Sequence, residues 1–221
     1  MKAEVSVEAN NLEAVIDRIV TTLKRKNEVR DLTLQRSREM IRFCANSIRA
    51  THRHEFVEAE GLLAQAKAAA ALMIQDVQPY PDLYFAGYVQ DATKELAEAA
   101  ITLAVITGQP LPDPETLNIE YAAYLNGLGE ATGEMRRYAL DSMRRDALED
   151  AERLLGIMDD VYTYLVTIDF PDALTGGLRR TTDLVRGVTE RTRGDLTTTV
   201  QEHKLQVALK NFGNRLPLDT I

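Results

Sequence analysis

The prolines of this 221-residue chain are confined to short junctions, which limits the folds that it can adopt. All seven lie in four places: Pro79 and Pro81; Pro110, Pro112 and Pro114; Pro171; and Pro217. The stretches between them are rich in Ala, Leu, Glu, Arg and Met, which are good helix formers. Because a proline inside a helix removes a hydrogen bond and clashes with the preceding turn, this distribution predicts an all-α protein.

Apolar residues recur at helical spacing and define the expected helices. The first is a very long helix from about 7 to 50, with room for a kink near Arg30. Others are expected at 54–75, at 81–106, at 118–144 with Asn118 as the cap, at 146–167 beginning at Asp146, and at 178–212 with Gly213 as a stop signal. We expect one domain over residues 1–221, a bundle of about six or seven long helices.

The composition sets further limits. Hydrophobic residues make up 45% of the chain, enough for a sizeable core, and no apolar run approaches the roughly 20 residues of a membrane span. The single cysteine, Cys44, excludes an internal disulfide and is expected as a small buried residue. The N-terminus has no apolar signal-peptide core, so we expect a cytoplasmic protein without membrane contacts. A helix of about 45 residues would span about 65 Å, too long for a small globule to cover without partners.

Two pairs of glutamates lie on helices that are otherwise nearly neutral. Glu95 and Glu98 are three residues apart and Glu130 and Glu134 are four apart, so each pair lies on one helix face. Unpaired carboxylates facing a helical core are costly to bury. Two such faces together would make an oxygen-only site suited to Mg²⁺ or Mn²⁺. The simpler alternative is that both faces are solvated, or that each glutamate pairs with an arginine such as Arg136.

Nearby glycines and the positions of the histidines limit the kinds of metal site that the glutamates can form. Gly127, Gly129 and Gly133 surround the second pair, and glycine costs roughly 1 kcal/mol inside a helix, so we expect a backbone or a ligand to approach closely there. A ferritin-like di-iron centre requires Glu-x-x-His, but the histidines lie far along the sequence from the glutamates. His52 and His54 are therefore expected at the surface or as phosphate contacts.

The formal net charge of −8 argues mildly against nucleic-acid binding, but the charge is unevenly distributed. Residues 24–53 hold nine lysines and arginines against three acids. This run is either a solvated helix face or a surface for phosphates. The residues that we select as candidate nucleic-acid contacts are Arg30, Arg36, Arg38, Arg42, Arg136 and Arg137.

Three segments of the sequence resemble the translin superfamily, in particular its catalytic subunit type, translin-associated factor X, and its archaeal-type relatives. They are Val-Arg-Asp-Leu-Thr-Leu-Gln-Arg-Ser-Arg-Glu at 29–39, Lys-Glu-Leu-Ala-Glu-Ala at 94–99, and Tyr-Leu-Asn-Gly-Leu-Gly-Glu-Ala-Thr-Gly-Glu-Met-Arg at 124–136. The last is similar to the family signature Tyr-Leu-x-Gly-x-x-Asp-Leu-Thr-Gly-Glu-Leu-Met-Arg. One departure is that the family aspartate is a glutamate at position 130.

The resemblance implies a seven-helix subunit that assembles into a hollow octamer and cleaves RNA with Mg²⁺. It implies catalytic roles for Glu95, Glu98 and Glu130, with Glu134 as the fourth metal ligand. The expected function is a metal-dependent endoribonuclease, with Mg²⁺ or Mn²⁺ as cofactor and RNA, or single-stranded DNA, as partner.

Three alternatives remain open from the sequence. The first is a non-catalytic oligomer that binds single-stranded nucleic acid. The second is an all-α nucleotide pyrophosphatase, which also places paired carboxylates on antiparallel helices. The third is a purely structural helical scaffold.

Overall fold

The computed structural model describes the backbone of residues 5–214 and the side chains from residue 11 onward. Within residues 5–214 there are nine helices and no strand, which confirms the prediction of an all-α fold. Six helices are long: α1 (Val5–His52), α2 (Phe56–Val77), α4 (Gly87–Thr107), α6 (Tyr121–Arg144), α7 (Leu148–Leu165) and α9 (Leu178–Gly213). Three are single turns: α3 (Pro81–Tyr84), α5 (Pro114–Leu117) and α8 (Asp172–Thr175).

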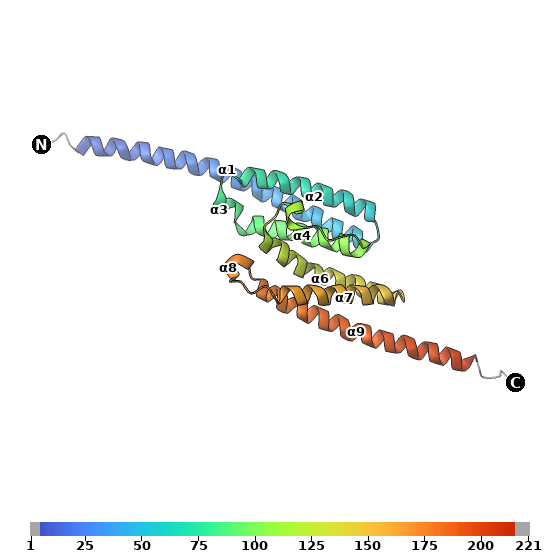
Figure 1. The fold of residues 1–221 in the computed structure, drawn as a ribbon. Coiled ribbons are helices and arrows are strands. Elements are labelled where there is room, and N and C mark those ends of the chain that lie inside the picture. The colour runs from blue at the N-terminus through green and yellow to red at the C-terminus, as the bar shows by residue number, and fades with distance from the viewer. Residues whose placement is uncertain (1–4, 215–221) are drawn as a thin grey trace.

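The long helices pack in successive layers. The α1 helix packs along α2 and α4, α4 packs on α6, and α6 packs on α7 and α9 (Figure 1). The two central helices, α4 and α6, are therefore covered from both sides. Side chains that lie between them are held at the middle of the molecule.

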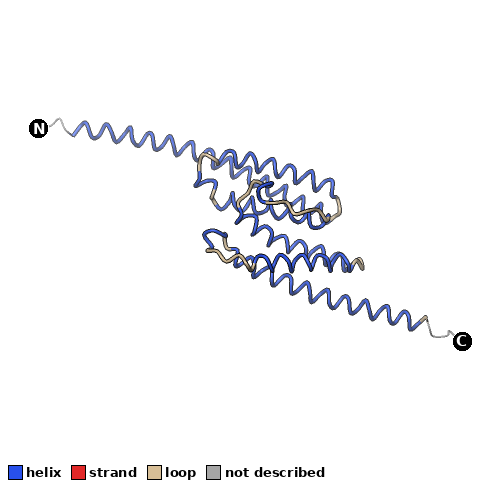
Figure 2. The backbone as a smooth tube through the Cα atoms, in the orientation of Figure 1, coloured by secondary structure: helices blue, strands red, loops and turns tan. Residues whose placement is uncertain are grey.

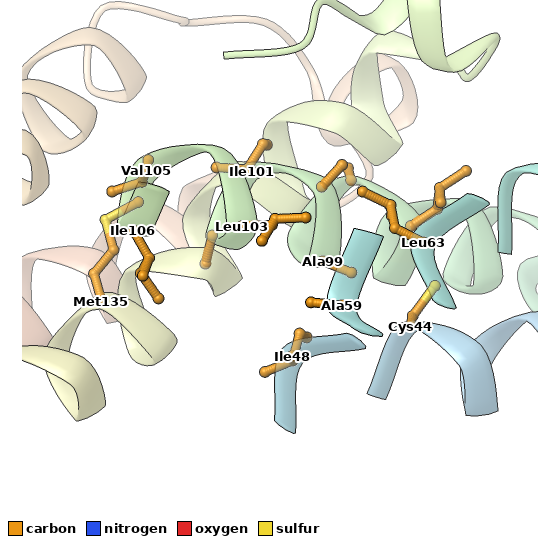
Figure 3. Packing of buried hydrophobic residues seen from close by; sticks show 14 of the residues in the cluster. Cys44, Ile48, Ala59, Leu63, Ala99, Ile101, Leu103, Val105, Ile106 and Met135 are labelled. Atoms are coloured by element: carbon orange, nitrogen blue, oxygen red, sulfur yellow. The ribbon is translucent and has the colours of Figure 1, made fainter. Parts of the chain in front are cut away.

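The core is centred on α4, whose residues from Ala99 to Ile106 are all buried. Ile101 of α4, Ile48 of α1, Leu63 of α2 and Met135 of α6 belong to one buried cluster (Figure 3). Each large aliphatic side chain that is fully buried contributes roughly 1.5 to 3 kcal/mol. A second, smaller cluster of Val161, Leu165, Leu178 and Val185 fixes α7 to α9. The assignment of residues 1–221 to one domain stays a prediction.

Three of the predicted helix boundaries were wrong. The helix expected at 81–106 is divided into α3 and α4, because Ala86 is extended and the side chain of Gln90 donates to the carbonyl of Tyr84. Asn118 does not cap α6 but ends α5 in the left-handed region, with φ of 54°. Asp146 is also left-handed, with φ of 59°, so α7 begins two residues later than expected.

The first and last long helices extend beyond the body of the bundle. The α1 helix is continuous for 48 residues, without an interruption near Arg30, and α9 is continuous for 36 residues through Gly187 and Gly194. The N-terminal half of α1 and the C-terminal part of α9 project from opposite sides of the bundle (Figures 1 and 2). None of the described helices combines the length and apolarity that a membrane span requires.

Candidate metal centre

Three of the four glutamates selected from the sequence come together between α4 and α6. Glu95 and Glu98 lie on α4 and Glu130 lies on α6. Each offers a carboxylate oxygen, and these three oxygens lie within 4.8 Å of one another. All three residues are half-buried, so the cluster is partly exposed to solvent. Among the described residues, the structure therefore brings together an all-oxygen set of the kind that Mg²⁺ and Mn²⁺ prefer.

Gly127 sets how closely the two helices approach. A Cβ atom at this position would lie 2.6 Å from the carbonyl oxygen of Lys94, 2.7 Å from Cβ of Ala97 and 3.1 Å from the amide nitrogen of Glu98. Only glycine fits against the α4 backbone at this position. The α6 helix therefore contacts α4 beside Glu95 and Glu98. The expectation of a close backbone approach is confirmed at this glycine.

The other two glycines have different surroundings. A Cβ atom on Gly129 would overlap the side-chain methyl of Thr181 and lie 3.4 Å from Val185, so this glycine lets α9 pack on α6. A Cβ atom on Gly133 would have no neighbour within 4 Å. Packing therefore explains Gly127 and Gly129, and nothing in the structure explains Gly133.

The cluster is electrostatically unfavourable without a cation. Burial, followed by the charges of Glu95, Glu130 and Glu134, raises the pKa of Glu98 to about 8, against the lowering effect of Lys94. Burial also raises the pKa of Glu95, again against the lowering effect of Lys94. Both shifts have the causes expected when carboxylates share a partly desolvated site. Full ionisation of Glu95 and Glu98 is therefore unfavourable unless a cation compensates for their charge.

One basic residue, Lys94, lies at the cluster. Its Nζ donates a hydrogen bond to Oε1 of Glu130 at 2.7 Å. Burial lowers the pKa of Lys94, but the hydrogen bond and charge of Glu130 outweigh that effect and the pKa is raised. In the simpler alternative each glutamate pairs with an arginine such as Arg136, but Arg136 lies 2.7 Å from Asp195 instead.

Glu134 lies one turn after Glu130 but is not part of the three-glutamate group. Its Oε2 accepts a hydrogen bond from Nε2 of His52, at the end of α1, and lies 3.9 Å from Nη1 of Arg137. The hydrogen bond from His52 lowers the pKa of Glu134, against the effect of burial. The expectation that His52 lies at the surface, away from the glutamates, was wrong. The two residues are 82 positions apart in the sequence, and only the packing of the bundle joins them.

Cys44 of α1 lies near enough to the cluster for the charges of Glu95 and Glu98 to act on its thiol. This side chain is 0% exposed, which confirms the prediction of a small buried residue. Burial raises the pKa of its thiol to about 12, and the nearby charges of Glu95 and Glu98 act in the same direction. A protonated thiol is a poor metal ligand, so the chemistry of the cluster remains that of its carboxylates.

The candidate nucleic-acid contacts differ in their surroundings. Arg36 lies 3.1 Å from Asp76 of α2, and Arg136 bonds to Asp195 of α9, so both connect helices. Arg30 lies 3.1 Å from its neighbour Asp31. The remaining candidates are exposed: Arg38 and Arg42 on α1, and Arg137 on α6. Arg38 and Arg42 line a shallow pocket with Gln35 and Glu39.

Comparisons with known proteins relate this fold and site to a family. No family model matches the sequence. The chain is similar to AfC3PO in its complex with duplex RNA, with a TM-score of 0.79 and 32% identity, over 85% of this chain and 97% of that one. The crystal structure of AfC3PO matches with a TM-score of 0.79 and 33% identity over the same shares of the two chains.

Two further relatives extend the comparison. Apo-NeC3PO has a TM-score of 0.76 at 20% identity, over 83% of this chain and 96% of that one, and this likeness concerns the fold alone. An uncharacterized protein of Methanocaldococcus jannaschii is 30% identical over 193 residues, which are 87% of this chain and 86% of that protein.

AfC3PO and NeC3PO are complexes of the translin superfamily. The match to AfC3PO covers almost the whole of that chain at 32% identity, and it agrees with the three segments that resemble the superfamily in sequence. This chain therefore belongs to the translin superfamily.

Proposed function

We propose that this chain is a metal-dependent endoribonuclease in which Glu95, Glu98 and Glu130 hold Mg²⁺ or Mn²⁺. The observation that carries the proposal is the convergence of three half-buried carboxylates within 4.8 Å. The similarity to AfC3PO, which was solved with duplex RNA, supports RNA as the substrate. Because the acids of the family signature are present as carboxylates here, we assign the chain to the catalytic type, as translin-associated factor X is.

The donor set fits the proposed ion. All three side chains in the cluster offer oxygen, which suits a hard cation. A bound Mg²⁺ or Mn²⁺ would polarise the phosphodiester and lower the pKa of a coordinated water molecule. Burial and the neighbouring glutamates raise the pKa of Glu98, so full ionisation of the cluster is unfavourable unless positive charge compensates for it, and this supports the proposed cation. Glu134, one turn away on the same face of α6, would be the fourth carboxylate.

The chain's own residues position the reacting groups. Lys94 holds the side chain of Glu130 through the 2.7 Å hydrogen bond to Oε1, which fixes the longer arm that replaces the family's aspartate. Its Nζ is also a positive group at the cluster that can contact a phosphodiester oxygen. Arg137, Arg38 and Arg42 are exposed and can bind further phosphates. The tight contact of α6 on α4 at Gly127 keeps the carboxylates at a fixed separation.

We also propose that the protein works as an assembly of copies, with an octamer as the expected form. Apolar side chains line the projecting part of α1, among them Leu12, Ile16, Ile19 and Leu23, and all are exposed. Those at the end of α9, such as Leu205 and Phe212, are exposed as well. Such long apolar stripes are usually covered by a partner.

The test is a panel of substrates with the purified protein. Labelled single-stranded RNA, duplex RNA, single-stranded DNA and nucleoside triphosphates are incubated with Mg²⁺, with Mn²⁺ or with a chelator. We expect internal cleavage of RNA that stops with the chelator. Binding of RNA or single-stranded DNA without cleavage in any metal would instead identify a non-catalytic nucleic-acid-binding oligomer. Hydrolysis of the triphosphates alone would identify a nucleotide pyrophosphatase.

A further inference from the structure

The contact between His52 and Glu134 joins the last turn of α1 to the middle of α6. The side chain of His52 is 4% exposed, and its Nε2 donates to Oε2 of Glu134, which is itself only partly exposed. A buried hydrogen bond to a carboxylate is stronger and better oriented than one at the surface. The two side chains are thus fixed relative to each other.

Among the described residues, the imidazole of His52 makes one hydrogen bond, which is the bond to Glu134. Its second nitrogen, Nδ1, is buried and has no hydrogen-bond partner among the described residues. The ring of Tyr138 packs beside the imidazole, with centroids 6.2 Å apart and the planes tilted by 35°. An apolar side chain could fill the same space without leaving a buried nitrogen unpaired. The histidine leaves Nδ1 unpaired but directs Nε2 at the carboxylate of Glu134. The favourable contact to Glu134 is what accounts for a histidine here.

Glu134 lies where it can belong to the metal centre. It follows Glu130 by four residues on α6, so the two carboxylates project from the same helix face. Both contacts of Glu134, with His52 and with Arg137, are made by Oε2. The other oxygen, Oε1, takes part in neither contact, so it is the oxygen of Glu134 that is available to a cation bound by Glu95, Glu98 and Glu130.

We propose that His52 is a positioning residue of the metal centre, which holds Oε2 of Glu134 so that Oε1 is presented to a divalent cation bound by the other three glutamates. This inference rests on the proposed metal site. Partners that hydrogen-bond to ligating side chains orient them, and their removal typically lowers metal affinity by about 10- to 100-fold. The centre then draws on three helices, with α1 contributing through His52.

The test measures Mn²⁺ binding to the full-length chain by titration calorimetry, together with the Mn²⁺ electron paramagnetic resonance spectrum. The variants are His52→Leu, which removes the donor, His52→Gln, whose amide nitrogen can take the place of Nε2, and Glu134→Gln. His54→Gln is the matched control, because His54 lies two residues away and contacts Tyr138 and Arg145.

We expect His52→Leu and Glu134→Gln each to weaken Mn²⁺ binding by about 10- to 100-fold and to change the resonance spectrum. His52→Gln should restore most of the affinity, and His54→Gln should leave it unchanged. The double variant His52→Leu/Glu134→Gln should bind Mn²⁺ no more weakly than Glu134→Gln alone, because His52 acts only through Glu134.

Two other sets of results would distinguish a purely structural role of His52 from the absence of a metal site. Lower melting temperatures for His52→Leu with wild-type Mn²⁺ affinity and spectrum would make the pair a structural link between α1 and α6 and overturn the inference. If His52→Leu does not fold, wild-type affinity in Glu134→Gln overturns it equally, since that variant keeps His52. Failure of the proposed function would look different, because the wild-type protein would then bind no Mn²⁺, or Glu98→Gln would bind it as well as the wild type.

Discussion

Glu98 is the residue of the site whose ionisation is most unfavourable in the folded protein. It is half-buried and has the charges of three other glutamates around it, and burial and these charges together raise its pKa to about 8. A structural role would be served better by a neutral side chain of the same shape. Carboxylates that are unfavourable to the fold in this way are common at functional sites, where a ligand compensates for them.

This environment predicts how the stability of the metal-free protein depends on pH. Burial raises the pKa of Glu98 from 4.5 in the unfolded chain to about 8, so between these values the folded state binds the additional proton. The free energy of unfolding should therefore fall as the pH rises from about 5 to about 8. Glu98→Gln should remove most of this fall and stabilise the metal-free protein by ~1 to 3 kcal/mol at about pH 8.

Thermal melts by circular dichroism in the presence of a chelator measure this effect. The wild type with added Mg²⁺ serves as the control, since the ion should restore the stability that falls away at high pH. A Glu98→Gln protein that is less stable than the wild type at every pH would show that Glu98 makes a favourable contact in the fold.

The residues of the site were predictable only where a local pattern identifies them. Spacings of three and four place Glu95 and Glu98, and then Glu130 and Glu134, on helix faces, and the structure brings three of these together. His52 could not be found in this way, because no local spacing links it to Glu134. Lys94 was not predicted as a site residue, because its position in the sequence does not show that its side chain reaches Glu130 on another helix.

At the scale of elements, the contact of α6 on α4 sets the geometry of the site. Gly127 lies against the α4 backbone between Lys94 and Glu98, at distances that no other residue could keep. The helices themselves are stabilised by the apolar core around α4. The glycine therefore determines the distance between the carboxylates more directly than the core does.

Gly127→Ala should disturb both the fold and the site. A Cβ atom 2.6 Å from a backbone oxygen forces the helices apart, which we expect to cost ~1 to 3 kcal/mol and to weaken Mn²⁺ binding. Gly133→Ala is the matched control on the same helix, with no neighbour within 4 Å. It should be neutral or stabilising by up to ~1 kcal/mol, because alanine favours the helix. Urea unfolding and Mn²⁺ titration check both, and equal effects of the two substitutions would contradict this account.

Helices were more predictable than their ends. Long proline-free stretches with helical spacing gave α1, α2, α6, α7 and α9 within a few residues. The boundaries failed at Asn118 and Asp146 because both side chains also tolerate the left-handed region, which ends one helix instead of capping the next. The break between α3 and α4 follows from the extended Ala86, which no proline or glycine at that position signals.

At the scale of the whole molecule, the projecting ends of α1 and α9 are apolar in places where the bundle cannot cover them. Leu12 is 63% exposed near one end of the molecule and Phe212 is 63% exposed near the other. These helices were expected from the sequence to need partners because of their length. The exposed apolar side chains of α1 and α9 support assembly. The number of copies depends on the angle at which neighbouring chains pack.

Light scattering should therefore give a mass several times that of one 24.7 kDa chain. Replacing Leu12, Ile16 and Ile19 together by glutamate should lower that mass, because charges would replace an apolar stripe. Lys67→Glu, which adds negative charge to an exposed position of α2, is the control and should leave the mass unchanged. A wild-type mass near that of a single chain at micromolar concentration would contradict the proposed assembly.

The charge distribution of the molecule makes a separate prediction for RNA binding. Arg38 and Arg42 are exposed on α1, so Arg38→Ala/Arg42→Ala should weaken binding and make it less sensitive to salt. The slope of log affinity against log salt concentration should become shallower by about 0.7 to 0.9 for each phosphate that the protein no longer neutralises. Arg36 is left unchanged because its ion pair with Asp76 supports the fold. Substitution of the exposed Arg144 and Arg179 removes the same charge elsewhere and is the control. A salt slope that is equal in both double variants would place RNA away from α1.

Whether the three glutamates hold a catalytic metal is tested by the rate of Mg²⁺-dependent RNA cleavage by Glu98→Gln, measured beside the wild type at equal assembly mass. We expect the rate to fall by more than about 100-fold, because removing a metal ligand should cost at least as much as removing the partner of a ligand. Glu95→Gln and Glu130→Gln should lose activity in the same way, whereas Glu130→Asp, which keeps a carboxylate, should retain cleavage. Full cleavage by Glu98→Gln or Glu95→Gln would contradict the claim that these glutamates hold the catalytic metal.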